Sequence, residues 1–278
     1  MSDLRKYPKF SVLMSVYKKE KPEYLDLALK SIEHQTVKPN EIILVEDGPI
    51  TSELKKIIVK HKEKFGKGFK IIISQRNQGL GLSLRLGTKY VSTEWIARMD
   101  SDDYSVPDRF EKQLQIIQST PDLAVIGGQI QEFSGNLKNI VGYRKVPTSR
   151  NKIYKFMKWR SPFNHPTVII NKNILEKVGG YVPFGNLEDY YLWLRIILSD
   201  YKTINLDKVL VKMRADEGMY SRRGYFSNIT YFYALRKFLY KNTNLTWIEM
   251  LLGNVIVTLN ILVPSRVRKY IYQYFLHR

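Results

Sequence analysis

Short apolar runs alternate with amphipathic stretches along the first 120 residues of the chain. The runs are rich in β-branched residues, which predicts buried strands, and they cover residues 10–16, 40–48, 69–75 and 94–100. Between them, apolar residues recur every three or four positions, which predicts helices at 22–35, 51–65, 79–91 and 107–119. This alternation predicts an α/β fold, with a mostly parallel sheet flanked by helices on both faces.

After Gly127 the alternation becomes irregular. We expect a strand, a short helix closed by two glycines, an amphipathic helix, a strand pair and two aromatic-rich helices. In chain order they lie at 167–170, before Gly179 and Gly180, and at 186–200, 201–214, 231–242 and 247–264. The sequence therefore predicts an α/β domain over residues 1–215 and a helical extension over residues 216–278.

The chain is strongly basic, with 45 Lys and Arg against 26 Asp and Glu and a formal net charge of +19. Such an excess indicates an anionic partner: a nucleic acid, phospholipid headgroups or a phosphorylated substrate. Residues 201–278 hold 13 basic and 4 acidic residues, so about half of the excess lies there. Cysteine is absent, which excludes a disulfide framework. No apolar signal segment precedes the first strand, so we expect a cytoplasmic protein.

Polar residues follow each of the first four predicted strands. In parallel sheets of this kind, ligands bind beyond the carboxyl ends of the strands. These positions hold Tyr17, then Glu46 and Asp47, then Arg76, then the acidic segment 100–103. Two of the four strand ends are therefore acidic in a basic chain.

Asp100 and Asp102 are separated by one residue, so both side chains can reach one bound ion. Mg²⁺ and Mn²⁺ prefer carboxylate and phosphate oxygens, which lets an aspartate cluster hold a metal that in turn binds phosphate. An Asp-rich turn that caps the helix after Pro107 is the structural alternative. We favour the metal because the neighbouring strand also ends in acid, and stacked carboxylates are costly unless a cation compensates them.

Five segments, in this order, resemble the inverting glycosyltransferases of family 2, and in particular the bacterial branch that builds exopolysaccharide and capsule repeat units. The segments are "FSVLMSVY", "QTVKPNEIILVEDGP", "NQGLGLSLRLG", "ARMDSDDYSVPDRFEKQ" and "EDYYLWLR". The resemblance covers about residues 8–215 and implies the GT-A fold, a Rossmann-like sheet that binds a nucleotide sugar.

The resemblance also implies a donor site. Tyr17 resembles the residue that packs against the nucleotide base, and Ser15 belongs to the same site. Asp47, with Glu46 beside it, falls where the family has a carboxylate that hydrogen bonds uracil. Asp100 falls on the first position of the family's Asp-x-Asp, which approaches the ribose. Packing of Tyr17 at a strand end and an Asp-Gly turn after Asp47 are the structural alternatives.

The remaining implied residues carry the chemistry. Asp102 falls on the second position of Asp-x-Asp and would bind Mn²⁺ or Mg²⁺ on the diphosphate. Arg76, which follows the third predicted strand, is our own candidate for helping to stabilise the leaving diphosphate. Asp189 falls on the acid of the family's Glu-Asp pair, which serves as catalytic base. Acids in a first helical turn are also favoured by the helix dipole, and His165, a lone histidine before proline, is more typical of a structural role.

Two features depart from the family pattern. Many relatives carry Asn where this chain has Arg85, so a donor contact from that position is not expected. The Gln-x-x-Arg-Trp signature of the processive members is absent from the sequence. We therefore expect the transfer of one hexosyl or N-acetylhexosaminyl group, from a donor that is UDP-linked, to a lipid-linked or polysaccharide acceptor.

The predicted helical extension, residues 216–278, suits a lipid-linked acceptor. Residues 247–264 form an 18-residue stretch, short of the ~20 residues that span a bilayer, and Glu249, Gly253 and Asn260 fall on one helical stripe. The segment is typical of a helix that lies in a membrane interface, with packing on the domain as the alternative. Basic and aromatic residues alternate in the segment 266–275, which suits anionic headgroups. We expect a peripheral enzyme at the inner face of the cell membrane.

Two other function classes have sequence support. Charge alone suggests a nucleic-acid-binding protein, but the predicted cleft is acidic and the basic excess lies at the end of the chain, so we expect no nucleic-acid partner. A sugar nucleotidyltransferase also uses paired aspartates and metal. It would carry a glycine-rich phosphate loop after the first strand, where "SVYKKEKPEY" has no glycine.

Overall fold

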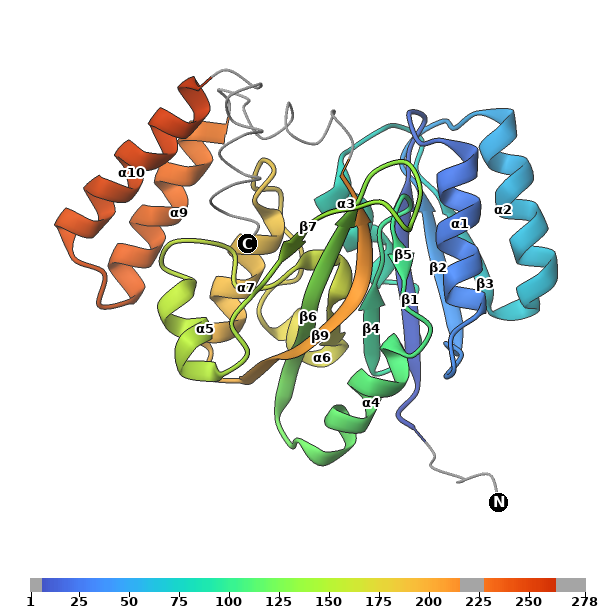
Figure 1. Ribbon diagram of the computed structural model, residues 1–278, viewed down its shortest axis with the longest axis horizontal. Coiled ribbons are helices and arrows are strands. Elements are labelled where there is room, and N and C mark those ends of the chain that lie inside the picture. Colours follow the sequence, from blue (N-terminus) through green and yellow to red (C-terminus); the bar gives the residue numbers. More distant parts are fainter. Residues whose placement is uncertain (1–6, 216–227, 264–278) are drawn as a thin grey trace.

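The computed structural model describes residues 7–215 and 228–263 and is drawn in Figure 1. These residues form a nine-stranded sheet of order β3-β2-β1-β4-β8-β6-β9-β5, with β7 beside β6. The first four strands in the chain pair in parallel, as the alternating pattern predicts. They are β1 (Phe10–Val16), β2 (Glu41–Glu46), β3 (Phe69–Ile73) and β4 (Trp95–Arg98).

The other half of the sheet is mixed. β8 runs antiparallel to β4 and β6, β6 runs parallel to β9, and β5 and β7 are short antiparallel additions. β6 and β7 were not expected from the sequence, and the expected strand pair at 201–214 is wrong, because that segment is one continuous strand. The strands are β5 (Tyr104–Ser105), β6 (Leu123–Phe133), β7 (Ile140–Arg144), β8 (Ile169–Asn171) and β9 (Lys202–Arg214).

Helices cover both faces of the sheet, and the alternation along β1 shows how. Val12 and Met14 pack in the hydrophobic cluster on one face, while Leu13 packs in the cluster on the other. The first face is covered by α1 (Pro22–Glu33), α2 (Ser52–Phe65) and α4 (Arg109–Ser119). The second is covered by α3 (Leu80–Thr88), α5 (Arg150–Phe156), α6 (Lys172–Lys177) and α7 (Glu188–Leu198).

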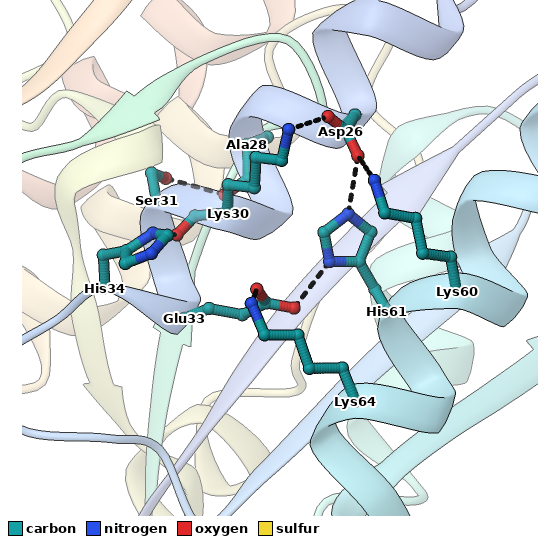
Figure 2. A network of polar contacts seen from close by, with 9 residues as sticks. All are labelled: Asp26, Ala28, Lys30, Ser31, Glu33, His34, Lys60, His61 and Lys64. Carbon is teal, nitrogen blue, oxygen red and sulfur yellow. Dashed lines mark hydrogen bonds and ion pairs between the residues drawn. The ribbon is translucent and has the colours of Figure 1, made fainter.

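A buried histidine ties α1 to α2 (Figure 2). His61 is 1% exposed and lies between two carboxylates of α1: its Nε2 is 2.9 Å from Asp26 Oδ1 and its Nδ1 is 2.5 Å from Glu33 Oε1. Lys60 of α2 binds the same Asp26 oxygen as His61, and Lys64 of α2 binds the other oxygen of Glu33.

The extension forms a helical hairpin of α9 (Asn228–Asn242) and α10 (Trp247–Leu262). Thr246 and Glu249 form a capping box that starts α10. Figure 1 shows the hairpin at the opposite end of the molecule from α1 and α2. Gly253 of α10 lies against the guanidinium of Arg236 in α9, where a Cβ would come within 2.0 Å of Cζ. The middle of the polar stripe of α10, at Gly253, therefore packs against α9.

The apolar side of α10 faces outward. Eight large apolar side chains are between 49% and 59% exposed there: Trp247, Ile248, Leu251, Leu252, Val255, Ile256, Leu259 and Leu262. Among the described helices, none combines the length and the apolar character that crossing a bilayer needs. The basic and aromatic segment 266–275 lies outside the described residues.

Candidate active site

The register of the parallel strands brings their carboxyl ends to one edge. Val16 of β1 pairs with Glu46 of β2, and Leu13 of β1 pairs with Arg98 of β4. The loops that follow these strands therefore begin side by side, and the acids after β2 and β4 flank the end of β1. This is the arrangement that the strand-end residues predicted.

Asp47 holds the loop between β3 and α3. Its Oδ1 accepts a hydrogen bond from the backbone amide of Gln78 (2.8 Å), and its Oδ2 accepts one from that of Gly79 (3.0 Å). The next residue, Gly48, has φ of +82°, and a Cβ there would lie 2.6 Å from the amide nitrogen of Asn77. Only glycine fits both the left-handed conformation and this close approach. In this structure the Asp47 carboxylate thus orders its neighbouring loop, and its uracil contact stays a prediction.

The acidic segment after β4 forms a tight cluster. Carboxylate oxygens of Asp100, Asp102 and Asp103 lie within 4.8 Å of one another. Arg214, at the end of β9, fixes the segment: its backbone amide donates to Asp103 Oδ1 (2.9 Å) and its Nε to the carbonyl of Asp102 (3.3 Å). Burial raises the pKa of Asp102 to about 7, with further contributions from the charges of Asp100 and Glu20.

Glu20, in the loop after β1, is a fourth acid beside this cluster. Ser101 Oγ donates to its Oε2 (2.5 Å), and the backbone amide of Lys21 donates to its Oε1 (2.9 Å). Burial raises the pKa of Glu20, and the nearby charge of Asp100 adds to the effect. The loops after β1 and β4 are therefore joined at the site.

The first turn of α7 brings two more acids. Glu188 is 8% exposed and packs against Gly81 of α3, and Asp189 Oδ1 accepts from the amide of Tyr190 (2.7 Å). Burial raises the pKa of Glu188 to about 7 and that of Asp189 to about 6. The charge of Asp100 contributes to both shifts, so α7 and the β4 loop share one electrostatic environment. We call these six residues the acidic site: Glu20, Asp100, Asp102, Asp103, Glu188 and Asp189.

The other predicted donor residues lie around this edge without joining the acidic site. Ser15 and Tyr17 are half-buried at the end of β1, and Glu46 is buried at the end of β2, where burial raises its pKa. Arg76 is exposed, and within the described residues no hydrogen bond or ion pair joins its side chain to the acidic site. Their contacts with a donor stay predictions.

His165 has a structural environment. Its Nε2 lies 3.0 Å from the hydroxyl of Tyr181, and its ring packs 5.8 Å from that of Trp193. Burial lowers the pKa of His165 well below its usual value, so the ring is neutral at pH 7 and helps to hold the segment before α7.

Three contributors were given no role from the sequence. Glu20 lies in the polar loop after β1, where only Tyr17 was considered. Asp103 belongs to the predicted acidic segment 100–103 and is the third acid of the cluster. Arg98, the last residue of β4, is 2% exposed and ion-pairs with Asp100; its signal is a single charged residue at the end of an otherwise apolar strand.

Comparisons with known proteins decide the family. The sequence pattern of Glycosyl transferase family 2 matches residues 11–179, more than half of the chain. The chain belongs to this family. It is a glycosyltransferase, as the resemblance of its motifs implied.

Two relatives align over nearly the whole chain. An amylovoran biosynthesis glycosyltransferase, AmsE, of Erwinia amylovora is 35% identical over 95% of this chain and 98% of its own length. A UDP-Gal:alpha-D-GlcNAc-diphosphoundecaprenol beta-1,3-galactosyltransferase of Escherichia coli is 35% identical over 98% of each chain. Similarity to these glycosyltransferases therefore extends through the helical extension.

Solved structures confirm the fold. S. aureus TarS 1-349, in complex with UDP-GlcNAc, superposes with a TM-score of 0.65 at 22% identity, covering 91% of this chain and 72% of that chain. The mannosyltransferase PcManGT from Pyrobaculum calidifontis, in complex with GDP-Man and Mn²⁺, superposes with a TM-score of 0.63 at 13% identity. The match covers 98% of this chain and 82% of the PcManGT chain. The family 2 chain thus has the predicted GT-A fold, with a helical C-terminal part.

Proposed function

We propose that this glycosyltransferase moves one sugar from a UDP-sugar to a hydroxyl of a lipid-linked or polysaccharide acceptor, with inversion at the anomeric carbon. The observation that carries the proposal is the acidic site, in which carboxylates from three separate segments raise one another's pKa. Such crowding is costly in a purely structural role and is typical of sites that bind a cation or catalyse proton transfer.

The UDP donor is supported by similarity. The E. coli relative is named for a UDP-Gal donor, and TarS is solved with UDP-GlcNAc. We propose that Ser15, Tyr17, Glu46 and Asp47 line the nucleoside end of the donor at the carboxyl ends of β1 and β2, and that Asp100 approaches the ribose. Arg76, exposed after β3, would approach the diphosphate.

The acidic site also fits a divalent metal. Clustered carboxylate oxygens are the ligands that Mg²⁺ and Mn²⁺ prefer. Asp103 Oδ2 is buried and has no hydrogen-bond partner among the described residues, which suits a cluster completed by a cation. PcManGT, which shares the fold, is solved with Mn²⁺. We propose Asp102 as the principal ligand, where a bound ion would stabilise charge on the leaving diphosphate.

Asp189 is proposed as the catalytic base. An alcohol is a weak nucleophile at neutral pH, so a carboxylate must accept its proton as the new bond forms. With a pKa of about 6, Asp189 is mostly ionised at pH 7 and still basic enough to take the proton. The amide of Tyr190 holds its Oδ1, which leaves Oδ2 to face the acceptor hydroxyl.

The acceptor is proposed to be a polysaccharide repeat unit on a lipid carrier. AmsE is named for amylovoran biosynthesis, and the E. coli relative is named for a sugar acceptor on diphosphoundecaprenol. The chain lacks the signature of processive members, so we propose that each acceptor receives one sugar.

The outward face of α10 is proposed to rest on the membrane that carries this acceptor. Its eight exposed apolar side chains form a continuous stripe without a charged residue, and a shallow groove of 320 Å³ opens beside Tyr233 and Leu251. A patch of this kind marks an interaction surface. The chain's net charge of +19 favours anionic headgroups, and we propose that the enzyme lies peripherally at the inner face of the membrane.

The proposal is tested by a transfer assay. The enzyme is incubated with UDP-glucose, UDP-galactose or UDP-N-acetylglucosamine, a synthetic lipid-diphosphate-linked sugar, and Mn²⁺ or EDTA. We expect addition of one sugar in Mn²⁺ only, and NMR of the product to give the anomer opposite to that of the donor. Absence of transfer from every donor, or a retained anomer, would contradict the proposed function.

A further inference from the structure

The acidic loop after β4 is anchored in the sheet at both of its ends and also at its middle. Residues 99–103 join β4, which pairs with β1, to β5, which pairs with β9. The contact at the middle comes from Arg214, the last residue of β9, whose backbone pairs with Phe133 of β6. The amide of Arg214 donates to Asp103 Oδ1 (2.9 Å), and its Nε donates to the carbonyl of Asp102 (3.3 Å). One residue of the sheet therefore binds a carboxylate and a backbone carbonyl of the loop.

The guanidinium of Arg214 is also fixed by groups outside the loop. Arg214 is 6% exposed, and its Nη1 donates to the carbonyl of Gly135 (3.2 Å), in the turn between β6 and β7. Its Cζ lies 3.6 Å from the centre of the Tyr24 ring and 4.6 Å from that of the Phe133 ring. Tyr24 belongs to the first turn of α1. The start of α1, the acidic loop and the β6–β7 turn therefore meet at one buried cation.

This position requires the geometry of arginine. A guanidinium is a planar fork, so two of its nitrogens can donate to different carbonyls while its face lies against an aromatic ring. A lysine ammonium would keep the charge, but it is a compact group that cannot hold the same carbonyls and ring contacts in one fixed arrangement. Displacing the buried fork would leave its N–H groups without partners in the interior, which is costly. The bonds of Arg214 thus fix the backbone position of Asp102.

We propose that Arg214 is a positioning residue for sugar transfer: it locks the backbone at Asp102 so that the carboxylates of the acidic loop close on one divalent cation. Removing a group that holds a metal ligand in place typically weakens metal binding by about 10-fold to 100-fold. This inference rests on the proposed function, in which Asp102 is the principal metal ligand. It adds that part of the metal affinity comes from a residue 112 positions along the chain from that ligand.

The position and the charge of Arg214 predict opposite effects on metal affinity. A cation beside the acidic site repels a second cation, so loss of the charge alone would tighten metal binding. A clamp on the loop holds the ligands ready, so loss of the fork would weaken metal binding. Arg214→Lys keeps the charge and removes the fork, whereas Arg214→Met removes both. The direction of the change in each variant therefore separates positioning from charge.

The test is thermal unfolding in UDP, which all of the proposed donors share, while Mn²⁺ is titrated. The Mn²⁺ concentration that gives half of the UDP-dependent rise in melting temperature is taken as the midpoint. We expect this midpoint to increase by about 10-fold or more in both Arg214→Lys and Arg214→Met. Saturating Mn²⁺ should restore the full rise, because the ligands themselves remain. A parental midpoint in Arg214→Lys, or a lower midpoint in Arg214→Met, would overturn the proposal.

Arg195→Lys is the matched control. The guanidinium of Arg195, in α7, also donates to two backbone carbonyls, those of Val178 and Gly180. Its Cζ lies 4.8 Å from the centre of the Tyr191 ring, and the two carbonyls follow α6, outside the acidic site. This variant should lower the melting temperature and keep the parental Mn²⁺ midpoint. An equal increase of the midpoint in Arg195→Lys would show that the midpoint follows stability alone, which overturns the proposal.

A third variant decides the matter if neither Arg214 variant folds. Tyr24→Leu keeps Arg214 and removes a ring against which its guanidinium lies, so it should raise the Mn²⁺ midpoint by about 3-fold. A parental midpoint in Tyr24→Leu would then overturn the proposal. The same titration separates this inference from the proposed function. A parent without any Mn²⁺-dependent rise would overturn both, whereas a parental rise that is unchanged in the Arg214 variants would overturn this inference alone.

Discussion

At the scale of single residues, Asp189, the proposed catalytic base, meets two opposing demands. A base must be ionised when the acceptor arrives, yet retain affinity for a proton. Burial raises the pKa of Asp189 to about 6, while Arg98 and the amide of Tyr190 keep it from rising further. The first turn of α7 also favours a negative charge through the helix dipole.

Replacing this carboxylate should separate chemistry from binding. Asp189→Asn is expected to lower kcat by roughly 100-fold to 10,000-fold and to change donor affinity little, because the amide cannot take the proton but keeps the shape. Asp200→Asn is the control, since Asp200 is exposed and pairs with Arg150 beyond the end of α7. Turnover within a few-fold of the parent in Asp189→Asn would remove Asp189 from the role of base.

The sequence predicted where the residues that directly follow a strand would lie. Asp47 and Asp102 follow β2 and β4, and the parallel order of the sheet brings those ends together. Arg98 and Glu20 could not be predicted in the same way. Whether a charged residue at the end of an apolar strand points into a core depends on neighbours far along the chain, here α7 and Tyr181.

At the scale of elements, the helices α1 and α2 are held by charge as well as by apolar packing (Figure 2). Burial alone would raise the pKa of Asp26, but the bonds from Lys30, Lys60 and His61 outweigh it and lower the pKa. The pKa of Glu33 is lowered in the same way. Both carboxylates therefore stabilise the fold above pH 5 and lose that contribution as the pH falls.

Removing the shared imidazole ring should loosen this pair of helices. His61→Ala is expected to lower the free energy of unfolding by about 2–3 kcal/mol at pH 7, since it leaves buried acceptors without their donor. Lys60→Ala, at a side chain that is 58% exposed, should cost less than about 1 kcal/mol. Urea unfolding measures the loss of unfolding free energy in each variant. The difference between the two losses should narrow between pH 5 and pH 3. Similar losses of unfolding free energy in the two variants would show that the buried ring is not the main contact between the two helices.

Strand β6 and the continuity of β9 were missed from the sequence for the same physical reason. Gly127 and Gly128 suggested the end of regular structure, but they lie inside β6, where β9 crosses closely: a Cβ on Gly128 would lie 2.5 Å from Leu210 Cδ1. In β9 the residues after Asn205 resemble a turn in the sequence. The strand nevertheless continues through them, with a shift of register against β6. Tertiary contacts overrode local turn preference in both strands.

At the scale of the whole molecule, the acidic site and the apolar face of α10 belong to different parts of the fold. The site lies at the carboxyl ends of the parallel strands, whereas α10 lies at the far end of the molecule from α1 and α2 (Figure 1). The sequence placed Glu249, Gly253 and Asn260 on one stripe of α10. It did not reveal that Gly253, in the middle of this stripe, packs against α9, because that depends on the contact with Arg236.

The membrane contact is tested with paired surface variants. Leu252→Ser with Ile256→Ser removes apolar area from the face of α10 and should weaken co-sedimentation with anionic vesicles by about 10-fold or more. The control is Val59→Ser with Ile73→Ser, at side chains of similar exposure near the end of the molecule that holds α1 and α2. This pair should leave vesicle binding unchanged. Equal vesicle binding by the two double variants, or a dimer of the parent that the α10 variant alone disrupts, would contradict a membrane role.

The central claim is that acids from separate elements hold a metal and a nucleotide sugar together. Its most direct test is thermal unfolding with UDP-glucose, UDP-galactose and UDP-N-acetylglucosamine, each in Mn²⁺ and in EDTA. Asp102→Asn is compared with Asp108→Asn, whose partly exposed carboxylate pairs with Lys112. We predict that one donor, at about 100 times its Kd, raises Tm by about 5 °C in Mn²⁺ only, and that Asp102→Asn alone abolishes the shift. No metal-dependent shift with any donor, or a full shift in Asp102→Asn, would contradict the account.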